Sequence, residues 1–504
     1  MSVLPALAAE ALERLGDHVC LVFEGERLRL GALLERSARL AGGLAGLGVA
    51  PGERVAVQMT NRPEVQVTAL AVWHAGGVVT PVMPTLTVPE LRHVLADSGA
   101  VVLVVSDDLL ERARAAADGL PVHLVVAGSG AGSGAATPLT DLEAGPPVPP
   151  AAGTGSDLAA LLYTGGTTGR SKGVALTADG LVQTTRARAQ VVALARAPRL
   201  LVPLPLSHVF GLTNLVARLH LAEPAPMVLQ RRFDAAGWLR LVAEHEVQSS
   251  ALVPSMLQLL LREDLEAADL STLRHVTTGG APLAVAVREE FEARVPSARV
   301  CDGYGCTEVT STATMNPYDA PRSGTVGRAV PGVELRIVDD LDRPLPAGTD
   351  GEVCVRSPGV MAGYWGDPAA TAQAVVDGWL HTGDVGHLDA DGYLTVVDRK
   401  KDLVIRGGFN VYPRDVEDVL LTHPDVAAAA VVGRPDAVLG EEVVAFVALR
   451  EGAAADRDAL LAHAAGALAA HKRPRELHVV DAVPLTSVGK TDRKALRDRA
   501  RPAP

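Results

Sequence analysis

Short apolar runs of strand length alternate with longer stretches of helical periodicity along the first half of the chain. Residues 30–47 carry apolar side chains at helical spacing, whereas residues 54–58 and 100–105 are short runs that suit buried strands. Further runs of the second kind occupy residues 199–203, 248–253 and 275–278. This alternation of strands and helices predicts parallel sheets covered by helices, the α/β class.

The composition of the sequence changes at three later places. Residues 127–157 are rich in Gly, Ala, Ser and Pro and predict a surface linker between two subdomains. Short strand-like runs separated by Gly and Pro predict a small β-rich subdomain over about 325–398. The charged run DRKKD at 398–402 marks a second break, beyond which we expect a small α+β domain with a helix beginning at Pro413.

The charge and the cysteines exclude several functional classes. A net charge of −12 argues against general affinity for nucleic acid or anionic lipid, although it allows a local basic pocket. Charged residues interrupt the apolar pattern at the N-terminus, and no apolar stretch reaches the about 20 residues of a membrane span. The four cysteines lack CxxC spacing and suit free thiols. We therefore expect a cytoplasmic protein that contains no membrane span and binds no nucleic acid.

The sequence LYTGGTTGRSKGVALT at 162–177 concentrates glycines, hydroxyls and one lysine between two apolar runs. Glycines let backbone N–H groups converge on an anion, while the hydroxyls and Lys172 supply further donors and charge. The order Gly-Lys-Ser/Thr of a Walker A loop is absent. A mobile Gly/Thr linker would share this composition, but the flanking strand-like runs favour a positioned loop that binds phosphate.

This loop is the first of nine motifs that occur in one order. They are YTGGTTGRSKG (163–173), PLSHVFG (205–211), TGGAPL (278–283), DGYGCTE (302–308), GTVGRAVPGVELRIVD (324–339), GEVCVRSPGVMAGYW (351–365), GWLHTGDVG (378–386), DRKKDLVIRGGFNVYP (398–413) and LTSVGKTDRKAL (485–496). The set resembles the adenylate-forming superfamily, which includes acyl-CoA and aryl-CoA synthetases, adenylation domains of peptide synthetases and firefly luciferase. The resemblance covers nearly the whole chain.

The resemblance implies a domain arrangement and a reaction in two steps. We expect an adenylate-forming domain over 1–398, a hinge over 399–401 and a small mobile α+β domain over 402–504, with Lys401 at the pivot. A carboxylic acid would attack the α-phosphate of ATP, releasing pyrophosphate and leaving an acyl-adenylate. The thiol of coenzyme A would then accept the acyl group. ATP, Mg²⁺ and coenzyme A are therefore the expected cofactors, and a small-molecule carboxylic acid is the expected substrate.

The same resemblance implies roles for residues of the nucleotide site. The phosphates would be held by Lys172 and by Thr164, Gly165, Gly166, Thr167 and Thr168. Glu308, together with Thr164, would bind Mg²⁺. Asp384 and Arg399 would bind the ribose, and Tyr304 would stack on the adenine. The other expected nucleotide-binding residues are Gly279, Gly280, Ala281, Asp302, Gly303, Gly305 and Thr307.

Four further residues receive catalytic or acceptor roles from the resemblance. Lys490 would place a positive charge between the attacking carboxylate and the α-phosphate. His208 would lie beside the carboxylate pocket, although a lone His between apolar residues is more often a core residue. Gly407 and Gly408 would approach the pantetheine of coenzyme A, and a turn with positive φ would require the same glycines.

The acid and its acceptor are less constrained. The segments expected to line the acid pocket, 209–214, 253–257 and 306–313, contain no Lys or Arg, which disfavours a second carboxylate and suggests a short- or medium-chain fatty acid or an aryl acid. A carrier-protein thiol, or an amine or nitrite, could replace coenzyme A as acceptor. A non-catalytic nucleotide-binding relative is a further alternative, which the complete charged set of Lys172, Glu308, Asp384, Arg399 and Lys490 disfavours.

Overall fold

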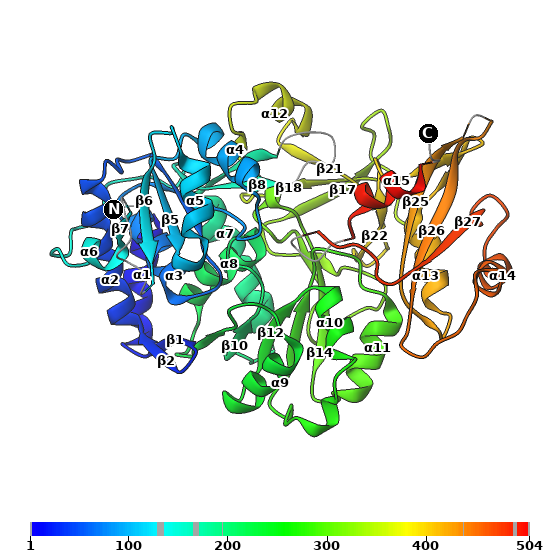
Figure 1. Ribbon diagram of the computed structural model, residues 1–504, viewed down its shortest axis with the longest axis horizontal. Coiled ribbons are helices and arrows are strands. Elements are labelled where there is room, and N and C mark those ends of the chain that lie inside the picture. The colour runs from blue at the N-terminus through cyan, green and yellow to red at the C-terminus, as the bar shows by residue number, and fades with distance from the viewer. Residues whose placement is uncertain are drawn as a thin grey trace.

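The chain forms a large body built on two mixed sheets, a smaller antiparallel sheet beside them, and a further sheet at the C-terminal end (Figure 1). The computed structural model describes residues 3–128, 136–164, 171–193, 195–436, 438–486 and 491–501. The N-terminus lies among the helices of the large body, and the C-terminus lies beside the last sheet. Within the described residues, none of the helices has the length and apolar character that a membrane crossing requires.

Eight strands of the described chain form the first sheet. In spatial order they are β19 (Gly363–Tyr364), β9 (Lys172–Thr177), β8 (Leu158–Thr164), β4 (Val78–Pro81), β3 (Arg54–Gln58), β5 (Val102–Ser106), β6 (His123–Ala127) and β7 (Thr137–Pro138). The strands from β8 to β7 are parallel to one another, β9 is antiparallel to β8, and β19 is antiparallel to β9. Every residue of β5 is buried, as expected for a parallel strand covered on both faces.

Two short elements lie within residues 127–157, where the sequence predicts a linker. β7 pairs with β6, and helix α6 (Leu139–Leu142) follows it directly. Leu139 is buried in the main core, and Leu142 lies against Gly43, where a Cβ atom would come within 2.6 Å of it. Residues 129–135 lie outside the described part of the chain.

Nine described strands form the second sheet. In spatial order they are β16 (Arg328–Ala329), β15 (Thr314–Met315), β14 (Arg299–Tyr304), β13 (His275–Thr278), β12 (Ser249–Leu252), β10 (Leu200–Val202), β11 (Met227–Leu229), β1 (Val19–Phe23) and β2 (Glu26–Arg29). The strands from β14 to β1 are parallel. Thr278 pairs with Asp302, so the carboxyl ends of β13 and β14 lie side by side at one edge of the sheet.

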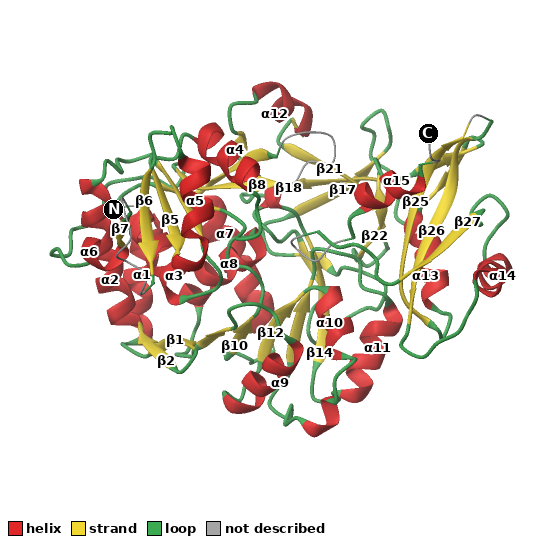
Figure 2. Ribbon diagram, in the orientation of Figure 1, coloured by secondary structure: helices red, strands yellow, loops and turns green. Residues whose placement is uncertain are grey.

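Helices cover the faces of both sheets (Figure 2). They are α1 (Val3–Leu15), α2 (Leu30–Gly46), α3 (Pro63–His74), α4 (Val88–Ser98), α5 (Leu110–Ala117), α7 (Ala178–Ala193), α8 (Val209–Ala217), α9 (Ala235–Glu244), α10 (Pro254–Leu260) and α11 (Val285–Arg294), with the 3₁₀ turns η1 (Asp107–Leu109), η2 (Arg218–His220), η3 (Leu265–Ala267) and η4 (Thr307–Val309). A single core cluster contains Val57 and Val104 of the first sheet and Val202 and Ala251 of the second, so the two sheets share one apolar interior.

The smaller sheet of the large body is antiparallel. Its strands are β17 (Glu334–Val338), β18 (Gly351–Arg356), β21 (Trp379–Leu388) and β20 (Val375–Val376), with β22 (Leu394–Arg399) paired to β21 and helix α12 (Pro368–Ala374) beside it. The register of β21 and β22 places Asp384 directly opposite Arg399.

The C-terminal region has its own sheet and its own core. The strands are β24 (Phe409–Val411), β23 (Val404–Arg406), β26 (Gly440–Leu449), β25 (Val426–Asp436) and β27 (Glu476–Val480), and the helices are α13 (Pro413–Leu421), α14 (Arg457–Ala467) and α15 (Arg493–Ala500). The core cluster that contains Val416, Val431 and Leu460 includes no residue of the large body. Helix α13 begins at Pro413, as predicted. The predicted fold class, α/β sheets with a β-rich part and a small C-terminal α+β unit, is confirmed.

Candidate active site

A buried carboxylate lies at the junction of the second sheet and the smaller antiparallel sheet. Asp384 of β21 is 3% exposed, and its Oδ2 accepts a hydrogen bond of 2.6 Å from the Tyr304 hydroxyl at the end of β14. Its Oδ1 lies 3.0 Å from Nε of Arg399, the residue opposite it in β22. The charge of Asp384 is the main cause of the raised pKa of Arg399. Three residues from three separate motifs thus form one contact group.

The glycine-rich segments that follow β13 and β14 lie next to this group because the two strands are parallel neighbours. A Cβ atom on Gly279 would stand 2.9 Å from the Gly303 carbonyl oxygen, and Gly280 has a φ of +82°. Both positions therefore need glycine for structural reasons. The close approach leaves peptide groups at the carboxyl edge of the sheet, where α/β proteins bind ligands.

Three groups at this junction have a raised pKa: Asp302, Tyr304 and Cys306. Burial raises the pKa of Asp302 to about 7, against the opposing charges of Arg288 and Arg414. Burial also raises the pKa of the Tyr304 hydroxyl well above its usual value, and the charge of Asp384 adds to this effect. Burial and the negative charges of Glu308 and Asp384 raise the pKa of Cys306, which keeps it a neutral thiol rather than a nucleophile.

Glu308 lies in the turn η4, between β14 and β15. The Tyr364 hydroxyl donates a hydrogen bond of 3.1 Å to its Oε1, and its backbone carbonyl accepts from the N–H of Met361 at 2.8 Å. No Lys, Arg or His of the described residues forms an ion pair with this carboxylate. A half-buried carboxylate without a cationic partner is a suitable oxygen ligand for Mg²⁺.

Tyr364 links Glu308 to the strands that flank residues 165–170. Lys172 Nζ lies 5.1 Å from the centre of the Tyr364 ring and 3.2 Å from Oδ2 of Asp367. Lys172 opens β9 and pairs in register with Thr164, the last residue of β8. The two strands therefore hold both ends of the loop. The loop residues themselves, Gly165, Gly166, Thr167 and Thr168, lie outside the described residues, as does Lys490.

His208 caps the N-terminus of α8. Its Nδ1 accepts a hydrogen bond of 3.2 Å from the backbone N–H of Phe210. In the neutral ring this leaves the proton on Nε2. The helix that follows His208 therefore fixes the orientation of its ring.

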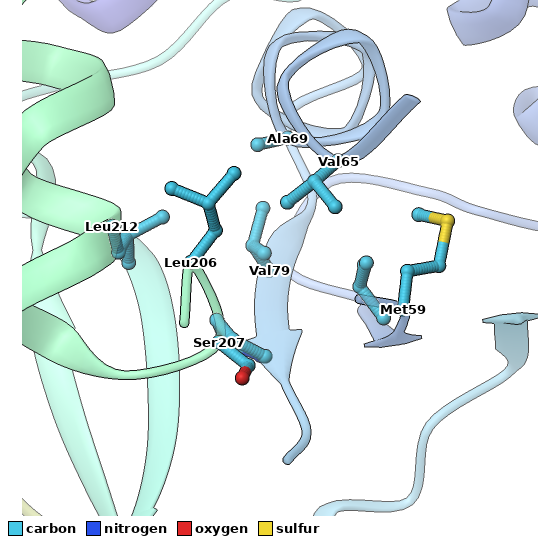
Figure 3. Close-up of a pocket in the computed structure, with 9 residues that line it drawn as sticks. Met59, Val65, Ala69, Val79, Leu206, Ser207 and Leu212 are labelled. Carbon is cyan, nitrogen blue, oxygen red and sulfur yellow. The ribbon is translucent and has the colours of Figure 1, made fainter. Parts of the chain in front are cut away.

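A small apolar cavity is lined in part by Leu206 and Ser207, the two residues that precede His208 in the sequence (Figure 3). It separates β3, β4 and α3 from the segment that leads into α8. Its lining residues are Val57, Met59, Val65, Ala69, Val79, Pro81, Leu206, Ser207 and Leu212. The Ser207 hydroxyl is directed to the Met83 sulfur at 3.1 Å, so the cavity offers a ligand little beyond apolar contact.

The remaining predicted residues lie in four places. Ala281 follows Gly280, and Gly305 and Thr307 lie between Tyr304 and Glu308. Gly407 and Gly408 form the exposed turn between β23 and β24, with φ values of +58° and +82°. Lys401 is exposed in the turn after β22, where the Asp402 N–H donates to the Arg399 carbonyl at 2.9 Å. The structure does not place either glycine or Lys401 in the contact group around Asp384.

Sequence reasoning missed Tyr364. It belongs to the motif GEVCVRSPGVMAGYW, but no spacing rule connects position 364 with position 308. The available signal was composition, because the chain has only six tyrosines and two of them, Tyr304 and Tyr364, contact carboxylates of the site.

Comparison with known proteins identifies the family. Residues 8–365 match the AMP-binding enzyme family, and residues 415–490 match the AMP-binding enzyme C-terminal domain. The chain is 36% identical over 491 residues to feruloyl-CoA synthase from Amycolatopsis sp., covering 96% of this chain and 97% of the relative.

Two solved structures superpose over nearly the full chain. The anthranilate CoA ligase AuaEII in complex with anthranoyl-AMP has a TM-score of 0.92 and 27% identity, covering 99% of this chain and 97% of the other. The amide bond synthetase McbA from Marinactinospora thermotolerans has a TM-score of 0.88 and 32% identity, covering 98% and 99%. The chain belongs to the AMP-binding enzyme family, in its acyl-CoA synthetase branch.

Proposed function

We propose that the protein converts an aryl acid, or a short- or medium-chain fatty acid, to its CoA thioester through an acyl-adenylate. The observation that carries the proposal is the contact group of Asp384, Tyr304 and Arg399 at the carboxyl edge of the second sheet. A buried carboxylate at this edge is suited to accept hydrogen bonds from ribose hydroxyls. Similarity to the feruloyl-CoA synthase and to the anthranilate CoA ligase supports the reaction and favours an aryl acid.

The roles proposed in ATP binding follow from the contacts among the residues of the site. Asp384 would exchange the Tyr304 hydroxyl for a ribose hydroxyl, while Arg399 stays paired with the carboxylate. Gly279 and Gly303 would leave space for the adenine, and the Tyr304 ring would stack on it. Lys172 would leave Asp367, an exposed partner, for the phosphates.

Glu308 and Thr164 would hold Mg²⁺, which neutralises phosphate charge when bound. The Tyr364 hydroxyl fixes Oε1 of Glu308 and leaves Oε2 for the ion. This arrangement accounts for the absence of a protein cation at Glu308 among the described residues, since the ion would supply that charge.

The acid end of the site would be formed by His208 and α8. Because Nδ1 accepts from the helix backbone, the ring orientation is fixed, and His208 would lie beside the carboxylate of the acid. Lys490 would stabilise charge at the α-phosphate during adenylation, and Gly407 and Gly408 would border the path of the CoA thiol after the C-terminal domain rotates about Lys401.

The test is a product assay with purified protein, ATP and Mg²⁺. Substituted benzoates, cinnamates and fatty acids of graded length are offered with and without CoA, and products are identified by mass. We expect AMP, pyrophosphate and acyl-CoA with at least one aryl acid, and Lys490→Ala should lose pyrophosphate release while still thiolating a supplied adenylate.

Two outcomes would contradict the proposal. An acyl-adenylate that accumulates in the presence of CoA, but forms an amide with a supplied amine, would replace the thiol acceptor by an amine, as the similarity to McbA allows. ATP binding without turnover of any acid would leave a non-catalytic nucleotide-binding protein.

A further inference from the structure

One buried arginine of the large body has no counter-ion. Arg188 of α7 is 5% exposed, and its Nη2 donates a hydrogen bond of 2.8 Å to Oδ1 of Asn214 in α8. Its Nη1 has no hydrogen-bond partner within the described part of the chain. Asn214 cannot turn to serve both nitrogens, because its Nδ2 donates to the Phe210 carbonyl at 2.8 Å and fixes the amide.

Burial of an unpaired charge is costly, and two other buried arginines have a carboxylate beside them. Arg406 pairs with Glu442 at 2.7 Å, and Arg288 lies 3.5 Å from Glu292. Arg218 lacks an acid partner but donates to the carbonyls of Pro198 and Ala225. At Arg188 burial lowers the pKa to about 10, and no carboxylate opposes it. A guanidinium in this condition attracts an anion or an acceptor oxygen.

The position of Arg188 connects it to the acid end of the site. Its guanidinium lies 5.1 Å from the centre of the Phe210 ring, and Phe210 and Asn214 are one turn apart on α8, the helix that His208 caps. The adjacent Ala187 packs against Met315 of β15, the strand paired with Gly303 and Tyr304. Helix α7 therefore contacts both α8 and the strand that pairs with Gly303 and Tyr304.

A second buried nitrogen, on His275, lies near Arg188. His275 of β13 is 2% exposed, and its Nδ1 has no hydrogen-bond partner in the described chain. Burial lowers the pKa of His275 to about 4, and the charge of Arg188 adds to this shift. Two nitrogens without a hydrogen-bond partner in the described chain, from α7 and β13, thus interact electrostatically.

We propose that Arg188 anchors the end of the acid that is remote from the reacting carboxyl group, by donating from Nη1 to an acceptor oxygen of the substrate. The preferred acid would carry a second oxygen, as a ring hydroxyl, a carbonyl or a second carboxylate. This inference rests on the proposed acid–CoA ligase function. Arg188 comes from α7, outside the segments expected to line the acid pocket, and those segments contain no Lys or Arg.

The experiment compares matched acids in the complete enzyme. The specificity constant kcat/KM is measured for benzoate and cinnamate against their para-hydroxy and para-carboxy derivatives, and for a linear fatty acid against the dicarboxylic acid of equal length. Arg188→Met removes the donor at similar volume. Arg186→Met, two residues away on the exposed side of α7, is the matched control.

We expect the wild type and Arg186→Met to prefer at least one acid with a second oxygen over its unsubstituted partner. Arg188→Met should lose that preference by about 10- to 100-fold, with unsubstituted acids used as well as before or better. The hydroxy, carboxy and dicarboxylic arms tell whether the acceptor is neutral or charged. Equal loss for both members of every pair would reduce Arg188 to a structural role and overturn the proposal.

A second variant keeps the test decisive if Arg188→Met does not fold. Asn214→Asp would give Arg188 an internal carboxylate, so turnover of carboxy-substituted acids should fall more than turnover of unsubstituted ones. An unchanged ratio would contradict the proposal. If the wild type turns over acids with and without a second oxygen equally well, the proposed role of Arg188 is wrong but the ligase function stands. If it turns over no acid, the function itself fails.

Discussion

At the residue scale, the chemistry of the site depends on how each charge is paired. Asp384 and Glu308 are both carboxylates in contact with a tyrosine hydroxyl, yet only Asp384 also binds an arginine. The two contacts fix the orientation of the Asp384 carboxylate, whereas Glu308 keeps the capacity to bind an added cation. The difference suits one carboxylate to hydroxyl groups of the nucleotide and the other to a metal ion.

Replacement of Asp384 by Asn should weaken ATP binding. The amide retains the shape but removes the charge that pairs with Arg399, and one of its two atoms becomes a donor facing a donor. We expect the KM for ATP to rise by about 10- to 100-fold, the range for loss of a charged hydrogen bond. Tyr304→Phe keeps the carboxylate and should change this KM less than Asp384→Asn does. A larger effect of Tyr304→Phe would contradict the assignment of Asp384.

At the element scale, the turn that carries Glu308 is held in an unusual backbone conformation. Thr310 and Ser311 have φ values of +57° and +84°, and the Thr310 hydroxyl donates to the Gly359 carbonyl at 2.6 Å. A Cβ atom on Gly305 would overlap the backbone carbonyl of Ser311. The position of Glu308 therefore depends on close backbone packing between β14 and β15.

Gly305→Ala should displace this turn. Because the obstructing atom is a backbone oxygen, it cannot rotate aside, and we expect a loss of at least about 2 kcal/mol in stability together with loss of the Mg²⁺-dependent first step. Gly46→Ala, at the end of α2 where a Cβ meets nothing within 4 Å, is the control and should be neutral or stabilising. Thermal unfolding and pyrophosphate release measure the two effects. If Gly305→Ala unfolds and releases pyrophosphate as the wild type does, the predicted clash with the Ser311 carbonyl is wrong.

At the scale of the whole molecule, Asp398 connects the large body to the C-terminal region. Its carboxylate accepts from the N–H of Arg399 at 2.8 Å and from the N–H of Arg414, at the start of α13, at 3.1 Å. Arg414 Nη1 also donates to the Val396 carbonyl at 2.7 Å. These contacts fix α13 against β22 in the observed arrangement, next to the proposed pivot Lys401.

The charge state of Asp398 should make stability depend on pH. Burial raises the pKa of this carboxyl from 3.8 to about 6, although the charge of Arg493 and the two N–H groups oppose the shift. Between pH 4 and 6 the folded state therefore binds more protons than the unfolded state, so the contribution is present below pH 4 and is lost as pH rises to about 6.

Asp398→Asn removes this contribution. The unfolding temperature of the wild type, relative to the variant, should therefore fall as pH rises from about 4 to 6 and stay constant above that range. Differential scanning calorimetry at a series of pH values measures it. Asp377→Asn, at an exposed position with φ +50° that Asn tolerates, is the control and should follow the wild type. A constant difference across the range would contradict the raised pKa.

The sequence predicted the parts of the protein that rest on local pattern. The strand runs, the helix start at Pro413 and the order of the nine motifs depend on residues close together in the chain, and they led to the α/β class and the AMP-binding family. The pairing of Tyr364 with Glu308 and the place of Arg188 could not be predicted. Each joins segments that are remote in sequence and meet only because sheets and helices pack against one another.

By itself, therefore, the sequence determined which chemistry the chain can perform, because glycines, carboxylates and lysines at fixed spacing suffice to describe a nucleotide site. The tertiary structure decided which charges are left unpaired. Glu308 and Arg188 are ordinary charged residues in the sequence, and only burial without an opposite charge makes one suited to a metal ion and the other to a substrate oxygen.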